Sequence, residues 1–231
     1  MISFDALPIS FRLEEAGQAS FGRIAINLND TTSVPQDAFD LVCKLIENMN
    51  IVLVQLIPGL KIKVKNLGAN LTEKGEPAFQ LQLLSCRNDK EIPLRNESEG
   101  IKKIVSILQL LIVMYNDPSI TVAIDELDSG VFEYLLGEIL NIISERGLGQ
   151  LIFTSHNLRP LETLDYGFIA FTTTNPENRY IRIKNKKSNN NLRDLYYRNI
   201  ILDEQSETLY DATNNGSIAF AFRDAGLTHE K

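Results

Sequence analysis

Residues 101–154 constrain the fold more than any other part of the chain, because two helical patterns alternate there with two short apolar runs. The first helical pattern, 101–115, is apolar on nearly every side in its second half, which predicts a buried helix. The second helical pattern covers 132–143, where apolar residues recur at helical spacing. The runs 120–124 and 150–154 have the length and the apolar composition of buried parallel strands. A further apolar run, 167–172, is expected to form a third strand. This order of elements predicts an α/β fold, with a parallel sheet and flanking helices.

The first 95 residues follow a different pattern, which predicts an α+β segment ahead of that sheet. Apolar and polar residues alternate over 23–29, as in a strand with one buried face. A long apolar helix is expected next, with Ser33 as its N-cap. Two more strands are predicted at 61–66 and 78–86.

Composition narrows the class of protein. The chain has 231 residues, of which 44% are hydrophobic and 23% charged, as expected of a globular protein with a sizeable core. Its net charge of −7 argues against a general nucleic-acid coat. No signal peptide is recognised, and the longest apolar stretch, 104–114, is too short to span a bilayer. We therefore expect a cytoplasmic protein with no membrane contact, divided into an N-terminal segment 1–95, a core 96–175 and a C-terminal basic hairpin and tail 176–231.

Two carboxylates follow the first predicted strand, at the edge where parallel sheets bind ligands. Asp125 and Glu126 come directly after the run 120–124. Adjacent carboxylates at a strand end are costly to desolvate without a cation, and a nucleotide-bound Mg²⁺ would supply that charge. Asp125 is then expected to serve Mg²⁺ through a water, and Glu126 to polarise the water that attacks in phosphoryl transfer. The alternative is a strand that runs into a charged surface loop, and both interpretations remain open.

His156 stands at the corresponding place after the second predicted strand. A histidine at a strand end can hydrogen-bond a γ-phosphate and respond to its presence. The alternative is a core or surface histidine without a catalytic role.

Ser98 and Gly100 open the helix that begins near Ile101. A helix N-terminus offers unpaired backbone N–H groups and a partial positive charge, which suit a phosphate. Gly100 would allow a ligand to approach closely, and Ser98 would supply a hydroxyl. The alternative is an ordinary helix cap at Ser98.

In their order and spacing, these motifs resemble those of ABC-type ATPases. Ser98-Glu99-Gly100 resembles the signature motif, and 120–126 resembles the Walker B strand. Leu127-Asp128-Ser129 resembles the D-loop, and 154–157 resembles the switch-histidine loop. The resemblance covers about residues 90–173. It is closer to soluble ATPases of the SMC, RecF and OLD kind, and to bacterial AAA-type ATP-binding proteins, than to transporters. Glu97 and Glu99 depart from the transporter signature, and a carboxylate beside a triphosphate is unfavourable unless it points away.

The resemblance implies ATP and Mg²⁺ as cofactors and assigns a role to each motif. The implied catalytic residues are Glu126 and His156, the metal ligand is Asp125, and the nucleotide-binding residues are Ser98, Gly100 and Asp128. No phosphate-binding loop of the form G-x-x-x-x-G-K-[ST] occurs in the sequence. The resemblance thus implies the C-terminal lobe only of a P-loop NTPase-like fold, which is not expected to be active alone.

The partner implied by the resemblance is an ATPase lobe that carries a Walker A motif, in the same or a separate chain. The two lobes would form a dimer with composite sites, which ATP closes and hydrolysis releases. Two alternatives remain open. One is a non-catalytic regulatory module that docks on a complete ATPase, and the other is a metal-dependent nuclease that uses Asp125, Glu126 and Asp128.

Residues 179–198 hold seven basic side chains against one acidic side chain, with three tyrosines interleaved. Such a stretch can make a weak contact with nucleic acid. A hairpin with a solvated loop is the alternative, and we favour it.

Overall fold

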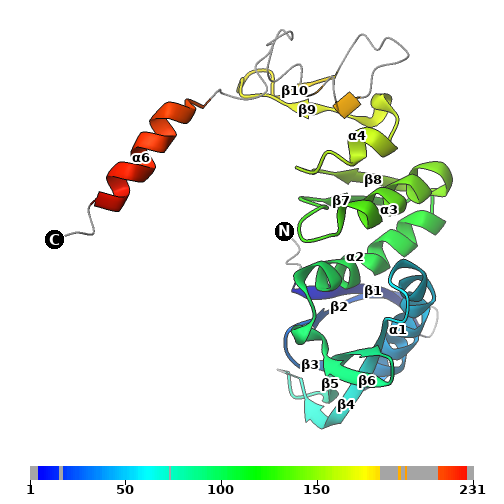
Figure 1. Cartoon of the computed structure of the whole chain (residues 1–231). Coiled ribbons are helices and arrows are strands. Elements are labelled where there is room, and N and C mark those ends of the chain that lie inside the picture. The colour runs from blue at the N-terminus through cyan, green and yellow to red at the C-terminus, as the bar shows by residue number, and fades with distance from the viewer. Residues whose placement is uncertain are drawn as a thin grey trace. The chain divides into compact units, whose positions relative to one another are not determined.

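The structure, a computed structural model, describes residues 5–15, 18–72, 74–182, 192–193, 196 and 213–227. The chain forms two compact units, 1–160 and 161–231, each with its own set of elements (Figure 1). The division at residues 95 and 175 stays a prediction.

The first part of unit 1–160 is built from antiparallel strands and one long helix. Its elements are β1 (Ala6–Glu15), β2 (Gln18–Asn27), β3 (Thr32–Pro35), α1 (Gln36–Leu56), β4 (Lys61–Leu71), β5 (Pro77–Arg87) and β6 (Lys90–Pro93). β1 and β2 form a hairpin, and the other strands form a sheet in the order β3-β5-β4, with β6 beside β5. Asn88 and Asp89 join β5 to β6 with φ of 49° and 60°, the left-handed pair that a two-residue hairpin turn requires.

Helix α1 packs against β3, β4 and β5 with an apolar face at helical spacing. The buried residues of this face are Ala38, Val42, Ile46, Met49 and Leu53. The prediction of Ser33 as the N-cap was wrong. Ser33 lies in β3 opposite Gln80, and this pairing keeps the chain extended up to Pro35. The helix therefore begins at Gln36, without a side-chain cap.

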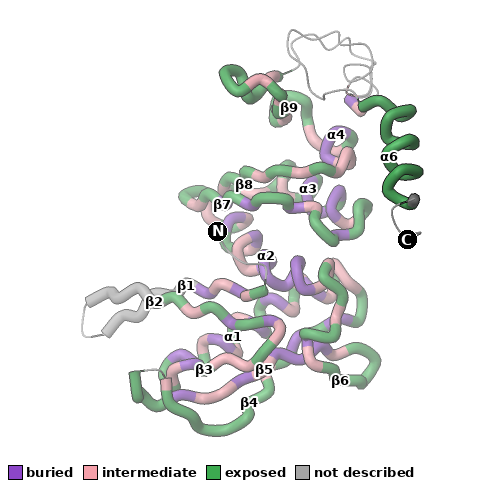
Figure 2. Tube along the Cα trace, turned by 90° about the vertical axis from the view of Figure 1, so that its left-hand side faces the viewer, coloured by how far each residue is buried: buried purple, intermediate pink, exposed green. Residues whose placement is uncertain are grey.

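The second part of this unit contains a parallel strand pair with a crossover helix. Its elements are η1 (Leu94–Asn96), α2 (Glu99–Asn116), β7 (Thr121–Ile124), α3 (Glu133–Arg146) and β8 (Gln150–Phe153). β7 and β8 are parallel, with Ile124 opposite Phe153, so their carboxyl ends lie side by side (Figure 1). Helix α2 packs against β1, α1 and β7, and all its residues from 102 to 108 are buried (Figure 2).

The prediction of a third parallel strand at 167–172 was wrong. The second unit contains α4 (Pro160–Thr163), which begins at its boundary, and then η2 (Tyr166–Phe168), β9 (Phe171–Thr172), β10 (Tyr180–Ile181) and α6 (Asn215–Leu227). Asp165 accepts a hydrogen bond from the N–H of Gly167, which winds the start of the apolar run into a 3-10 turn. The two residues that remain extended pair with β10 in antiparallel fashion.

Among the described residues, parallel pairing is thus limited to β7 and β8. The structure is a mixed α/β fold with several small sheets, and this pair is all that it contains of the predicted P-loop NTPase-like sheet. Over the same residues, no helix has the length and apolar character needed to cross a bilayer.

Candidate functional site

The turns that follow β7 and β8 meet at one edge of the parallel pair. Thr154, directly after β8, donates a hydrogen bond from its hydroxyl to the Asp125 carboxylate. The same Thr154 oxygen accepts the backbone N–H of Glu126 at 2.8 Å. One threonine therefore fixes both candidate residues of the first turn, a role that sequence reasoning missed because Thr154 was read only as part of the motif around His156.

Asp128, in the turn after β7, bonds to residues in the turn after β8. Its carboxylate accepts the backbone N–H of His156 at 3.2 Å and that of Asn157 at 3.0 Å. Bonds from backbone donors to a carboxylate are among the stronger hydrogen bonds. The carboxylate of Asp128 therefore orients the segment that carries His156.

Glu126 and His156 face each other across this edge. The Nε2 of His156 lies 3.9 Å from an Oε1 of Glu126, which is beyond direct hydrogen-bond range. Both side chains are more than half exposed. The gap is too narrow for an atom between the two groups, but a water or a phosphate oxygen beside them would be able to contact both.

A buried lysine that the sequence analysis did not single out lies behind Glu126. The Nζ of Lys103 donates a 3.0 Å hydrogen bond to the backbone carbonyl of Glu126. Burial lowers the pKa of Lys103 to about 8, although the nearby carboxylates of Glu126, Asp128 and Asp125 act in the other direction. Glu126 itself has a φ of +47°, in the left-handed region that residues with a Cβ disfavour.

The start of α2 rests against the turn after β7. Ser98 is the N-cap of α2, and its hydroxyl accepts the N–H of Ile101 at 3.4 Å. A Cβ placed on Gly100 would lie 2.1 Å from the carbonyl oxygen of Gly130. Because glycine has no side chain, Gly100 makes room for the backbone of Gly130 in the same chain. This packing role is separate from the close approach of a ligand that the sequence suggested.

Both acidic residues of the signature-like segment have donors within the chain. Glu97 accepts a hydrogen bond from the hydroxyl of Ser85. Glu99 pairs with Lys102 at 2.7 Å, and Lys102 also donates to the side chain of Asn29 at 3.0 Å.

The carboxylates at this edge do not form a ready-made metal cage. Within the described ranges, no three His, Cys, Asp or Glu side chains gather as a metal site. Asp125 accepts from Thr154, whereas Asp128 accepts from the backbone of His156 and Asn157, so these two carboxylates are held by different donors. The donors do fit Mg²⁺ bound together with a nucleotide, because that ion takes one or two carboxylates plus phosphate oxygens and waters.

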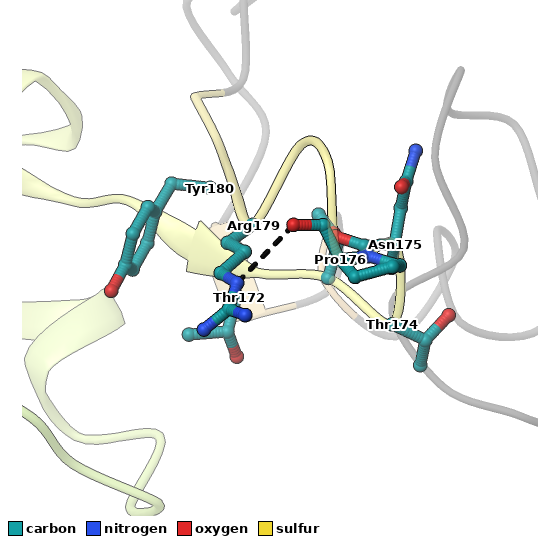
Figure 3. Close-up of a pocket in the computed structure, with 7 residues that line it drawn as sticks. Thr172, Thr174, Asn175, Pro176, Arg179 and Tyr180 are labelled. Atoms are coloured by element: carbon teal, nitrogen blue, oxygen red, sulfur yellow. Dashed lines mark hydrogen bonds between the residues drawn. The ribbon is translucent and has the colours of Figure 1, made fainter.

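A surface hollow of about 390 Å³ lies in the second unit, around the β9–β10 connection (Figure 3). It is lined by Thr172, Thr173, Thr174, Asn175, Pro176, Arg179 and Tyr180. Arg179 donates from Nε to the carbonyl of Pro176 at 3.2 Å, so its head group is partly used to brace this loop. None of the candidate ATP-site residues line the hollow. Most of the basic segment 179–198, including 183–191, lies outside the described residues.

Comparison with known proteins gives matches among solved structures only. No protein-family model and no curated protein matches the chain. A structure of the SMC head bound to the C-winged helix domain of ScpA is 13% identical, with a TM-score of 0.41, over 54% of this chain and 38% of that one. A structure from work on ATP-driven dimerization and DNA-stimulated activation of SMC ATPases is 12% identical, with a TM-score of 0.49, over 74% of this chain and 99% of that one. An SMC head domain with a coiled coil and joint from Pyrococcus yayanosii is 14% identical, with a TM-score of 0.42, over 56% of this chain and 25% of that one.

The chain is thus similar to SMC head domains, and SMC proteins are among the soluble ATPases that its sequence resembles. It spans less than two thirds of the first and third of these proteins. With TM-scores below 0.5, the similarity assigns no activity to this chain.

Proposed function

We propose that this chain carries the hydrolytic half of an ABC-type ATP site and works as one lobe of a dimeric ATPase. The phosphate-binding loop would come from another lobe, in the same or a separate chain. The observation that supports the proposal is the interlocked edge after β7 and β8. There Thr154 holds Asp125 and Glu126 from one side, and Asp128 holds His156 from the other.

In this proposal the two carboxylates after β7 have different tasks. Asp125 would hold Mg²⁺, directly or through a water, and the ion would neutralise charge on the nucleotide phosphates. Glu126 would accept a hydrogen bond from the attacking water and orient it. The exposure of Glu126 leaves its carboxylate accessible to a water and a nucleotide.

His156 would donate a hydrogen bond to a phosphate oxygen on the far side of that water. At 3.9 Å the two side chains are too close for a water between them, but they are near enough to act on one bound phosphate and on the water beside it. Asp128 would act through the backbone, because its bonds to the N–H groups of His156 and Asn157 set the direction of the histidine.

The parallel strand pair also supports a second lobe. Parallel strands are normally covered on both faces and extended by further strands. In this chain β7 and β8 leave Ala123 exposed and Ile152 54% exposed. A second lobe packed on this face would cover the apolar surface, and Ser98 at the start of α2 would cap the ATP of the partner lobe.

The test is to produce this chain together with a phosphate-loop segment encoded in the same or a neighbouring reading frame, and to measure ATP hydrolysis. We expect Mg²⁺-dependent turnover by the complex and very weak binding of Mg-ATP by this chain alone in calorimetry. Glu126→Gln should keep ATP binding and stop turnover, because an amide cannot accept the proton. The ATP-bound dimer of this variant should then accumulate in gel filtration.

Glu138→Gln, at an exposed position of α3, is the matched control and should turn over as wild type does. Full turnover by Glu126→Gln would contradict the proposed role of that residue. A complex that forms and never hydrolyses ATP would contradict the enzyme and favour the regulatory module.

A further inference from the structure

Lys103 holds the peptide of Glu126 from inside the molecule. It lies near the start of α2, is only 3% exposed, and donates to the Glu126 carbonyl at 3.0 Å. The same carbonyl accepts the N–H of Ser129 at 3.0 Å, which closes the turn after β7. The lysine therefore ties a helix whose residues 102–108 are all buried to the turn that carries Glu126.

Glu126 needs such support because its backbone is in a disfavoured conformation. A φ of +47° brings Cβ close to the following carbonyl oxygen, and a residue with a side chain stays there only where its surroundings hold it. Its N–H donates to Thr154 at 2.8 Å and its C=O accepts from Lys103. The side chains of Thr154 and Lys103 thus hydrogen-bond to the N–H and to the C=O of Glu126, respectively.

We propose that Lys103 is a positioning residue, which keeps Glu126 left-handed and thereby directs its carboxylate toward His156. If φ changed to the right-handed or extended region, the Glu126 side chain would swing away from the histidine that now lies 3.9 Å from it. The consequence for hydrolysis rests on the proposed function, whereas the grip on the backbone does not.

Lys102 provides a matched control because it is the neighbouring residue and is also buried. Its ammonium group reaches Asn29 and Glu99 and makes no bond to Glu126 that the structure shows. Methionine in place of either lysine keeps an unbranched apolar chain of similar length and removes the charge and the donors.

The first experiment measures amide hydrogen exchange of residues 125–131 in the nucleotide-free full chain. Lys103→Met should speed exchange there about tenfold, and Lys102→Met should leave it within about twofold of wild type. In a Glu126→Gly background the left-handed conformation needs no support, so Lys103→Met should add less than about threefold. Equal effects of the two lysines, or an undiminished effect in the Glu126→Gly background, would overturn the proposal.

The second experiment measures ATP hydrolysis in the complex described above. Lys103→Met should lower kcat about 10- to 100-fold with little change in KM for ATP, because the water-orienting group is misplaced while nucleotide binding is intact. If Lys103→Met speeds amide exchange at residues 125–131 and leaves kcat unchanged, the positioning role in hydrolysis is refuted. If wild type itself does not hydrolyse ATP, the proposed function fails, and the exchange experiment still decides whether Lys103 holds Glu126.

Discussion

The backbone contact between Gly100 and Gly130 makes the smallest possible substitution a severe one. In Gly100→Ala the new Cβ would lie 2.1 Å from the carbonyl oxygen of Gly130 and 3.1 Å from its carbonyl carbon. Ordinary contacts begin at 3.4 Å, so the start of α2 and the turn after β7 would have to separate by about 1.3 Å (3.4 − 2.1). Both partners are backbone, so no flexible side-chain end can move away instead.

The expected loss of stability has two parts. Overpacking of a close-packed site costs about 1–3 kcal/mol. The separation also stretches the bond from Lys103 to Glu126, which spans the same two segments at 3.0 Å, and losing a bond from a charged donor costs about 1.5–3 kcal/mol. Because the two parts are coupled, we expect Gly100→Ala to lower the free energy of unfolding by about 3 kcal/mol. That is a large share of the roughly 5–15 kcal/mol that stabilises a typical domain.

Urea unfolding followed by far-UV circular dichroism measures this loss, because helices α1, α2 and α3 all belong to unit 1–160. For a urea dependence of about 1–3 kcal/mol per molar, the midpoint should fall by about 1 M or more. Gly226→Ala is the control, since a Cβ there meets nothing within 4 Å, and it should not lower the midpoint. A Gly100→Ala midpoint equal to that of wild type would refute the reasoning.

The remaining predictions concern the signature-like serine, the buried lysine and the basic segment. Ser98→Arg should abolish ATP hydrolysis by the assembled enzyme without changing the circular dichroism spectrum, because a bulky cation would stand where the γ-phosphate approaches; unchanged turnover would leave Ser98 as a helix cap only. Burial lowers the pKa of Lys103 from 10.5 to about 8, so its destabilising effect is full below about pH 8 and is relieved as the pH rises toward 10.5. From pH 7 to pH 9.5, the free energy of unfolding of wild type should therefore rise by about 2 kcal/mol relative to that of Lys103→Met, as measured by urea unfolding. A difference that stays constant with pH would contradict this. Burial raises the pKa of Cys43 and Cys86, which lowers stability as the pH rises, but this contribution is common to both proteins and cancels in the difference. If residues 179–198 bind DNA, fluorescence anisotropy should show affinity falling steeply with salt, and binding that is insensitive to salt would exclude phosphate contacts.

The elements that carry the site were predictable because their patterns are local. The helical spacing over 101–115 corresponds to α2, and the β-branched run 120–124 corresponds to β7, each within one or two residues. The third strand was not predictable, because a short apolar run becomes a strand only if it finds a partner. At 167–172 the local turn at Asp165 and the pairing with β10 prevailed.

Within the candidate site, the sequence indicated the residues at the strand ends and missed those that hold them. Lys103 interrupts an apolar helix, and such a lysine is normally assigned to a solvent-facing side. Helix α2 packs against β1 and β7, which come from other parts of the chain, so the burial of Lys103 cannot be recognised from the local sequence. Thr154 has no feature of its own in the sequence, since its two bonds to Asp125 and Glu126 exist only once β7 and β8 are in register.

The acidic residues of the signature-like segment bear directly on the proposed composite site. A carboxylate that lacked a partner beside the start of α2 would repel a triphosphate and weaken closure of the dimer. Here the buried hydroxyl of Ser85 engages Glu97, and the nearly buried Lys102 engages Glu99. Each acid that departs from the transporter signature therefore has a donor in the same chain, and the Lys102 ammonium also offsets the charge of Glu99. Because Lys102 offsets the charge of Glu99, the positive end of the α2 dipole keeps more of its attraction for an anion, which is compatible with the proposed role of Ser98 at the phosphate of a partner lobe.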